Sequence, residues 1–250
     1  VVGEAGMGKT RLCHDLIRGV DRFAVEVWHA SAEPSQNQAP FSTLAPLILD
    51  LGGVAPFDDE TTRWKKLVTL VDASAPGPHA YRIVEFFAEI CGVEVLRRKP
   101  SRTFEGAKRD PMTLGEATRR ALGDFVAAVA AVRPLLLVLE DIQWADQATL
   151  SFLDAALREL VDRPIVVVAL ARPEIDRVYP NLFSGRRVQT IHLEPLSPSA
   201  SAKIAEDILG DDATGEAVER VVKGAGGNPF FVEELARAVL AGAGEQLPDT

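Results

Sequence analysis

The sequence predicts an α/β fold, in which a parallel β-sheet lies between helices and a small all-helical region follows. LLLVLED (135–141) and PIVVVALAR (164–172) are continuous apolar runs, and an amphipathic helix pattern separates them. Such runs are typical of parallel strands that are buried on both faces. After Pro195 the patterns are helical only. We therefore expect a sheet-containing core over residues 1–195, and a helical lid with the start of a linker over residues 196–250.

The composition limits the classes of protein to which the chain can belong. Its net charge of −9 argues against a surface dedicated to nucleic acid. No apolar run approaches the ~20 residues of a membrane-spanning helix, and no signal-peptide pattern is present. Cys13 and Cys91 lie far apart within helical patterns. We expect two buried, reduced thiols in a cytoplasmic protein, since neither zinc-ligand spacing nor a G-x-S-x-G motif occurs.

The first ten residues contain VVGEAGMGKT, which fits the motif G-x-x-x-x-G-K-[ST] from Gly3 to Thr10. In this motif backbone N–H groups of a glycine-rich loop surround a phosphate, and the next helix adds its N-terminal dipole. Lys9 would reach the β- and γ-phosphates of a nucleotide, and Thr10 would contact Mg²⁺. The residues expected to bind the nucleotide here are Gly3, Glu4, Ala5, Gly6, Met7, Gly8, Lys9, Thr10 and Arg11. The alternative is a flexible glycine turn that matches by chance.

The other elements follow from the spacing of the apolar residues. Val1 and Val2 would be the end of a first strand, and we therefore expect the sequence to be an excerpt from a longer polypeptide. Asp146 is expected to cap the helix between the two apolar runs. Helices are predicted at 9–20, 42–51, 60–71, 81–91, 113–132, 147–161, 199–209, 215–223 and 230–241, further strands at 23–30 and 188–193, and loops at 34–40 and 97–111.

Two acidic residues, Glu140 and Asp141, end the first apolar run. They would lie at the carboxyl edge of the sheet, where ligands bind in open α/β folds. One carboxylate would hold Mg²⁺ together with Thr10, and the other would orient or deprotonate an attacking water. We take the Asp141 carboxylate as the catalytic group that acts on the water, and both Glu140 and Asp141 as candidate metal ligands. The alternative is a pair of acids that merely ends a strand beside a helix.

At this point the residues carry a family resemblance. LVLEDIQWAD (137–146) resembles the Walker B segment of AAA-like ATPase modules in the signal-transduction ATPases with numerous domains. In that group the module is fused to kinases, adenylate cyclases or LuxR-type helix-turn-helix domains. Four further stretches agree in order: APFSTLAPL (39–47) with the segment after a strand, VALARPE (168–174) with the sensor-1 strand, HLEPLS (192–197) with the entry to the lid, and GNPFFVEEL (227–235) with the G-x-P motif.

The resemblance implies a P-loop NTPase with sheet order 5-1-4-3-2 that binds ATP or ADP with Mg²⁺. It places Pro229 against the adenine and gives Arg172 a role in sensing the γ-phosphate, beside Lys9 and Asp141 as catalytic residues. An ion pair of Arg172 with Glu140 or Asp141 is the structural alternative. Many relatives have Asp where this chain has Glu140. Of the other side chains, we expect Trp144 to pack under the sheet edge, Arg237 to be exposed, and Phe230 and Phe231 to be core residues of the lid.

The function predicted is a slowly hydrolysing ATP switch in a multidomain cytoplasmic regulator. Its partners would be ATP and the effector and sensor domains attached in the same chain, with no membrane and no direct nucleic-acid contact. Nucleotide-dependent self-association is compatible with this role. Three alternatives stay open: a P-loop small-molecule kinase, a DNA-associated initiator ATPase of the origin-recognition type, and a nucleotide-locked scaffold without turnover.

Overall fold

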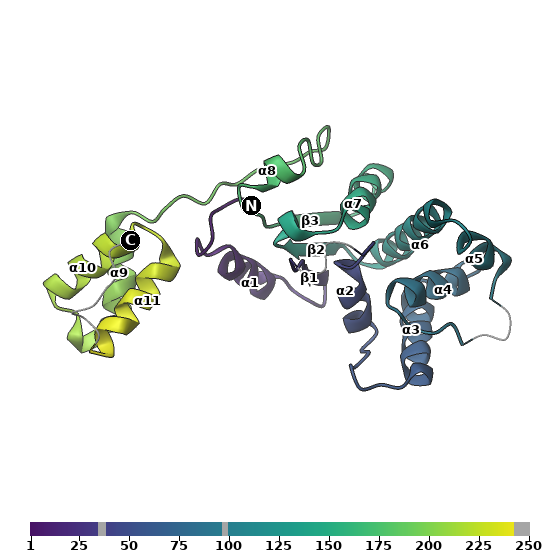
Figure 1. Ribbon diagram of the computed structural model, residues 1–250, viewed down its shortest axis with the longest axis horizontal. Helices are drawn as coiled ribbons and strands as arrows, with labels where there is room; N and C mark the ends of the chain where they lie inside the picture. The colour runs from purple at the N-terminus through teal and green to yellow at the C-terminus, as the bar shows by residue number, and fades with distance from the viewer. Residues whose placement is uncertain (35–38, 97–99, 243–250) are drawn as a thin grey trace. The chain divides into compact units, whose positions relative to one another are not determined.

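The computed structural model describes residues 1–34, 39–96 and 100–242, and it divides into two compact units. The loop–lid unit consists of Val1–Leu16 and Gln189–Thr250, and the sheet unit consists of Ile17–Val188. Figure 1 labels the helices and strands of both. The start of the chain thus groups with the C-terminal helices, which is a different division from 1–195 and 196–250. Those predicted domain boundaries stay a prediction.

The sheet unit contains three parallel strands, β1 (Glu26–Ser31), β2 (Leu135–Glu140) and β3 (Ile165–Ala169), in the order β1-β2-β3. β2 is central and all six of its residues are buried, as its apolar run predicts. β3 pairs with β2 and is only partly buried, with Val166 59% exposed. The prediction of burial on both faces is therefore wrong for β3. The five-strand order 5-1-4-3-2 stays a prediction.

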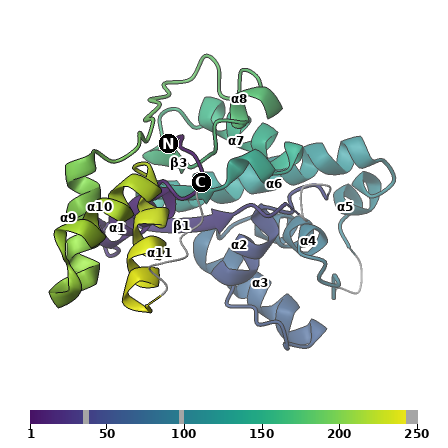
Figure 2. The ribbon, with the colours of Figure 1, turned by 60° about the vertical axis from the view of Figure 1, so that its left-hand side comes forward.

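A large helical group stands in the chain between β1 and β2. It consists of α2 (Leu44–Leu51), α3 (Glu60–Ser74), α4 (Ala80–Ile90), α5 (Arg102–Ala107) and α6 (Pro111–Val132). Figure 2 shows α2, α3 and α4 grouped beside β1. After β2 come η1 (Ile142–Trp144) and α7 (Gln147–Glu159), and after β3 comes α8 (Ile175–Val178). The predicted helices are confirmed with small shifts of their ends, whereas β1 begins three residues later than predicted, because Phe23 lies in a turn and is 95% exposed.

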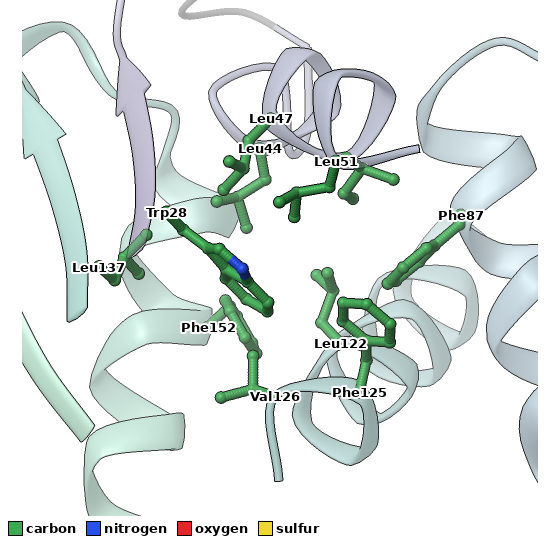
Figure 3. Close-up of a pocket in the computed structure, with 11 residues that line it drawn as sticks. Trp28, Leu44, Leu47, Leu51, Phe87, Leu122, Phe125, Val126, Leu137 and Phe152 are labelled. Atoms are coloured by element: carbon green, nitrogen blue, oxygen red, sulfur yellow. The ribbon is translucent and has the colours of Figure 1, made fainter. Parts of the chain in front are cut away.

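Aromatic side chains join this helical group to the sheet. Trp28 of β1 stacks on Phe125 of α6 at 5.7 Å between ring centroids, and Phe87 of α4 meets Phe125 edge-on at 4.9 Å. Leu137 of β2 and the leucines of α2 complete the cluster (Figure 3). The cluster encloses an apolar cavity of only about 30 Å³. The packing therefore fixes the helical group on the sheet from which the candidate acids project.

The segment 97–111, predicted as an exposed loop, contains α5. Ser101 caps this helix by accepting a hydrogen bond from the Phe104 N–H, and it donates its own N–H and hydroxyl to the buried Glu85 of α4 at 2.7 and 2.5 Å. Phe104 packs edge-on against Phe86. The prediction of a loop is wrong because the contacts of Phe104 with Phe86 and of Ser101 with Glu85 stabilise a helix in a segment that is otherwise rich in charged residues. Residues 97–99, and residues 35–38 of the other predicted loop, lie outside the described residues.

The lid consists of α9 (Pro198–Leu209), η2 (Gly210–Asp212), α10 (Gly215–Ala225) and α11 (Pro229–Leu240), within two residues of the helices predicted. Its core includes Val221, Val232 and Ala236, which are fully buried. Phe230 and Phe231 are 53% and 44% exposed, so their prediction as core residues is wrong. The helical period instead turns Val232 and Ala236 inward. The predicted linker from 243 onward lies outside the described residues.

Three smaller expectations have clear outcomes. The predicted strand 188–193 is present only as a single parallel bridge between His192 and Val2. Both cysteines are buried thiols rather than disulfide partners, as expected, and burial raises the pKa of Cys91 to about 12. Among the described residues, no helix combines the length and the apolar character needed to cross a membrane.

A buried carboxylate, that of Asp146, ties the helical group to the segment after β2. Asp146 is 2% exposed and caps α7 by accepting the Thr149 N–H at 2.8 Å, as predicted. It also accepts the N–H groups of Phe41 and Thr43 at 2.8 and 3.0 Å, more than 100 residues away. Phe41 has a φ of +61°, a strained conformation for a bulky residue. One side chain thus holds three backbone N–H groups, from two segments of the chain, at one point.

The pKa of Asp146 reflects two opposed effects. Burial would raise it, but hydrogen bonds from the backbone of Thr43 and Thr149, the Thr149 hydroxyl and the backbone of Phe41 outweigh burial and hold the pKa below its ordinary value. The ionised form is therefore favoured in the folded state. Its stabilising effect is complete above the unfolded-state pKa of ~3.9, and it is lost as the pH falls toward the lower folded-state pKa.

We predict that Asp146→Asn lowers the free energy of unfolding by about 3 kcal/mol at pH 7, since several buried donors lose an ionised acceptor. The matched control is Asp59→Asn, because Asp59 caps α3 from an exposed position and Asn is an equally good cap. Urea unfolding at pH 7 and pH 3.5 measures both. The gap between wild type and Asp146→Asn should narrow at pH 3.5; a gap that is independent of pH would contradict the ionised state.

Candidate functional site

The glycine-rich loop has the backbone conformation that an anion-binding nest requires. Gly6 and Gly8 have φ angles of +79° and +84°, and α1 (Lys9–Gly19) begins directly after the loop. Val2, just before the loop, donates its N–H to Ile191 and accepts from the N–H of Leu193, both at 2.8 Å. A short strand contact therefore precedes the loop and a helix follows it. This is the context that the motif needs in order to hold a phosphate.

The side chains at the start of α1 lie close to the loop. The Lys9 ammonium donates to the carbonyl oxygens of Gly3 and Glu4 at 2.7 and 2.8 Å, so it lies across the loop. Thr10 is exposed on the first turn of α1. Arg11 forms an ion pair with Glu233 of α11 at 3.5 Å. Lys9 and Thr10 thus lie directly after the loop, at the start of α1, and their roles as phosphate and Mg²⁺ ligands stay a prediction.

The lid motif GNP contacts the loop directly within the loop–lid unit. Asn228, the N-cap of α11, donates its amide to the Ala5 carbonyl at 3.0 Å, and the N–H of Phe230 donates to the Gly6 carbonyl at 3.2 Å. Pro229 is the first residue of α11 and lies between these two contacts in the sequence. The structure therefore brings the predicted base-contacting residue and the predicted phosphate loop into one unit.

In the sheet unit, Glu140 ends β2 and is buried, with 7% of its surface exposed. Its carboxylate lies 2.7 Å from Nε2 of His29 on the neighbouring strand β1. Glu140 is paired with Ser31, and His29 lies two residues before Ser31, so the side chains of His29 and Glu140 are diagonal neighbours on one face of the sheet. The contact of His29 was not predicted from the sequence. The alternation of side chains along β1 shows which face His29 lies on, but it does not show which residue of β2 lies beside it.

Asp141 follows in a left-handed conformation, with a φ of +54°. Such outliers cluster at functional sites, and Asp tolerates this region better than most residues do. Gln143 donates its amide to the Asp141 carboxylate at 2.9 Å and accepts the N–H of Arg172 at 3.1 Å. One buried amide thus joins Asp141, the residue directly after β2, to Arg172, three residues after the end of β3. The sequence did not indicate this role for Gln143.

The guanidinium of Arg172 lies over the ring of Trp144, 4.8 Å from its centroid. This stacking, rather than the ion pair with Glu140 or Asp141 that was considered, is the interaction the structure gives the Arg172 side chain. Trp144 is half-buried against the core, as expected. Arg237 is exposed as expected and pairs with Glu233 and Glu234 on its own helix.

The candidate residues thus fall into two sets. The loop residues 3–11 and Pro229 belong to the loop–lid unit, whereas Glu140, Asp141 and Arg172 belong to the sheet unit. Carboxylate and hydroxyl oxygens are the ligands that Mg²⁺ prefers, so Thr10, Glu140 and Asp141 suit that ion chemically. That the two sets hold one nucleotide and one metal ion stays a prediction.

Comparison with known proteins adds independent information. The family model described as "AAA ATPase domain" matches residues 1–168. The chain is 22% identical, over 248 residues, to the uncharacterized protein R02095 of Rhizobium meliloti strain 1021. That alignment covers 96% of this chain but only 22% of the relative, so the chain spans about a fifth of the relative's length. No solved structure gives a significant match.

The family match covers more than half of the chain and includes both the glycine-rich loop and the acidic end of β2. Both features are those of a P-loop NTPase, and the family description adds that the domain is an ATPase. The chain therefore belongs to the AAA ATPase domain family.

Proposed function

We propose that this chain is an ATP-binding, slowly hydrolysing switch module of a larger signalling or transcriptional regulator. The observation that carries the proposal is the loop geometry: two left-handed glycines lead into α1 at Lys9, in a chain of the AAA ATPase domain family. The similarity to one fifth of a long bacterial protein supports a module within a larger chain. The resemblance to signalling ATPases supports the regulatory role.

Binding would begin at the loop. The N–H groups between Ala5 and Lys9 would surround the β-phosphate, and the Lys9 ammonium would exchange the carbonyls of Gly3 and Glu4 for phosphate oxygens. Mg²⁺ held by Thr10, Glu140 and Asp141 would neutralise charge on the phosphates. The adenine would lie against Pro229.

Hydrolysis requires a water oriented toward the γ-phosphorus. The Asp141 carboxylate would accept a proton from this water while the water oxygen forms a bond to the γ-phosphorus. The bond between the γ-phosphorus and the oxygen that bridges to ADP would break, and ADP would leave. Gln143 fixes the carboxylate from one side. Arg172, whose N–H is held by the same amide, would contact the γ-phosphate. ATP and ADP would then differ in the contacts they make, which is what a switch needs.

We predict that Lys9→Ala reduces ATP and ADP affinity by about 100-fold or more, since two charge-assisted hydrogen bonds to phosphate are lost. The control is Lys203→Ala, which removes an exposed lysine of the same unit. Titration with a fluorescent nucleotide measures affinity, and circular dichroism checks the fold. Unchanged affinity of a folded Lys9→Ala protein would refute the phosphate-loop assignment.

For the two acids we predict different defects. Asp141→Asn should keep Mg-ATP bound but slow phosphate release by about 10²- to 10⁴-fold, because an amide cannot accept the proton of water. Glu140→Gln should instead weaken the Mg²⁺ dependence of nucleotide binding. Asp162→Asn, an exposed acid of the same unit, is the control. Exchanged phenotypes would reverse the roles. ADP formation that needs an added small-molecule acceptor, with the γ-phosphate transferred to that acceptor rather than released, would favour the kinase alternative.

For Arg172 we predict that its replacement by Ala lowers ATP affinity about tenfold or more and leaves ADP affinity nearly unchanged. A hydrogen bond to a charged group contributes ~1.5–3 kcal/mol, and ADP has no γ-phosphate with which to form it. Calorimetric titration with ADP and a non-hydrolysable ATP analogue measures the ratio, with the exposed Arg177→Ala as control. Equal weakening of both nucleotides would mean that Arg172 acts only through its packing on Trp144.

A further inference from the structure

The loop–lid unit contains a clasp between the glycine-rich loop and the first turn of α11. The Asn228 amide donates to the Ala5 carbonyl at 3.0 Å, and the Phe230 N–H donates to the Gly6 carbonyl at 3.2 Å. The Asn228 side-chain oxygen also accepts the Phe230 N–H at 3.0 Å. Asn228 therefore has two functions in one side chain: its oxygen caps α11, and its amide nitrogen holds the loop.

The packing at Gly6 shows how close this approach is. A Cβ on Gly6 would lie 2.6 Å from the Asn228 oxygen and 2.9 Å from Cβ of Phe230. Gly6 is thus required both by its positive φ and by the proximity of α11. The Arg11–Glu233 ion pair joins α1 to α11 as well, but Arg11 is largely exposed and the pair contributes little.

The choice of acceptors has a consequence for phosphate binding. The carbonyls of Ala5 and Gly6 share peptide groups with the N–H donors of Gly6 and Met7. The motif assigns both N–H groups to a phosphate, and the Met7 N–H, which donates to the Glu4 carbonyl at 3.3 Å, would exchange that acceptor. A hydrogen bond to a peptide carbonyl polarises the peptide and strengthens its N–H as a donor. It also restricts the loop to one conformation before a ligand arrives, which reduces the entropic cost of binding.

We propose that Asn228 is a positioning residue for the phosphate loop: its amide fixes the Ala5 carbonyl, and the helix turn that it caps fixes the Gly6 carbonyl. The proposal rests on the proposed function, since it assigns a role toward the nucleotide phosphates. Asn228 itself contacts no phosphate. By thermodynamic linkage, a nucleotide bound to the loop should in turn stabilise the first turn of α11.

The test separates the two functions of Asn228. Asn228→Ser and Asn228→Asp both retain an oxygen that can cap α11. Ionised Asp has no donor for the Ala5 carbonyl, and the Ser hydroxyl lies one bond nearer the backbone than the Asn amide nitrogen that makes this contact at 3.0 Å. We expect both to lose nucleotide affinity while the melting temperature without nucleotide stays near that of wild type. One neutral hydrogen bond corresponds to about a three- to tenfold loss. The charge of Asp adds a further loss at low salt, so titration at 0.1 M and 0.5 M NaCl isolates it.

Thr214→Ala is the matched control, because the Thr214 hydroxyl caps α10 of the same lid by accepting the Ala217 N–H at 3.2 Å. It should lower the melting temperature and leave ADP affinity unchanged. The second readout is amide exchange: ADP should slow exchange of Phe230 in wild type and much less so in Asn228→Ser.

Each outcome decides the proposal. If Asn228→Ser binds ADP as tightly as wild type while Lys9→Ala does not bind, Asn228 is only a helix cap and the proposed function stands. If Thr214→Ala weakens ADP binding as much as Asn228→Ser does, lid stability rather than loop positioning explains the effect, and the proposal fails. If Lys9→Ala binds normally, the phosphate-loop assignment itself is wrong.

Discussion

Backbone outside helices and strands needs hydrogen-bond partners for its N–H and C=O groups that regular secondary structure does not supply, and this constraint organises both units. In the sheet unit the solution is a buried carboxylate: Asp146 accepts N–H groups from the strained Phe41, from Thr43 and from Thr149. In the loop–lid unit the carbonyls of the loop are bound by Lys9, Asn228 and the Phe230 N–H, and within the proposed function its N–H groups would bind the phosphate.

The positions of the candidate acids depend on Asp146, because only a few residues of the chain separate it from Asp141. Asp141 and Asp146 bracket η1, and Gln143 inside this bracket holds both the Asp141 carboxylate and the Arg172 N–H. The Tyr179 hydroxyl adds a bond to the Ala145 carbonyl at 2.5 Å. A left-handed Asp at position 141 is a conformation of higher energy, and it persists only where neighbouring contacts over-determine it. The aspartate of W-A-D is thus a structural support for the acids that precede it.

The sequence predicted the features of the fold that depend only on residues adjacent in the chain. The buried β2, the cap at Asp146 and the glycine-rich loop each follow from a few adjacent residues. What could not be predicted depends on partners distant in the chain: Asp146 with Phe41, His29 with Glu140, and Asn228 with Ala5. The helix α5 was missed because its stability comes from Glu85 and Phe86 of another helix rather than from its own charged sequence. The prediction for Phe230 is wrong for a different reason: the residue is hydrophobic, but it lies on the face of α11 opposite to the buried Val232 and Ala236.

The division into units bears on how a switch of this kind would discriminate nucleotides. The clasp of Asn228 and Phe230 uses loop carbonyls, whereas a phosphate would use loop N–H groups, so the two do not compete. The clasp would persist with ATP and with ADP, because both nucleotides carry the phosphate that the nest surrounds. Within the proposed function, the loop–lid unit would therefore report that a nucleotide is present but not which one. Discrimination of the γ-phosphate would have to come from groups outside the clasp, and Arg172, fixed through Gln143 beside Asp141, is the candidate that the geometry favours.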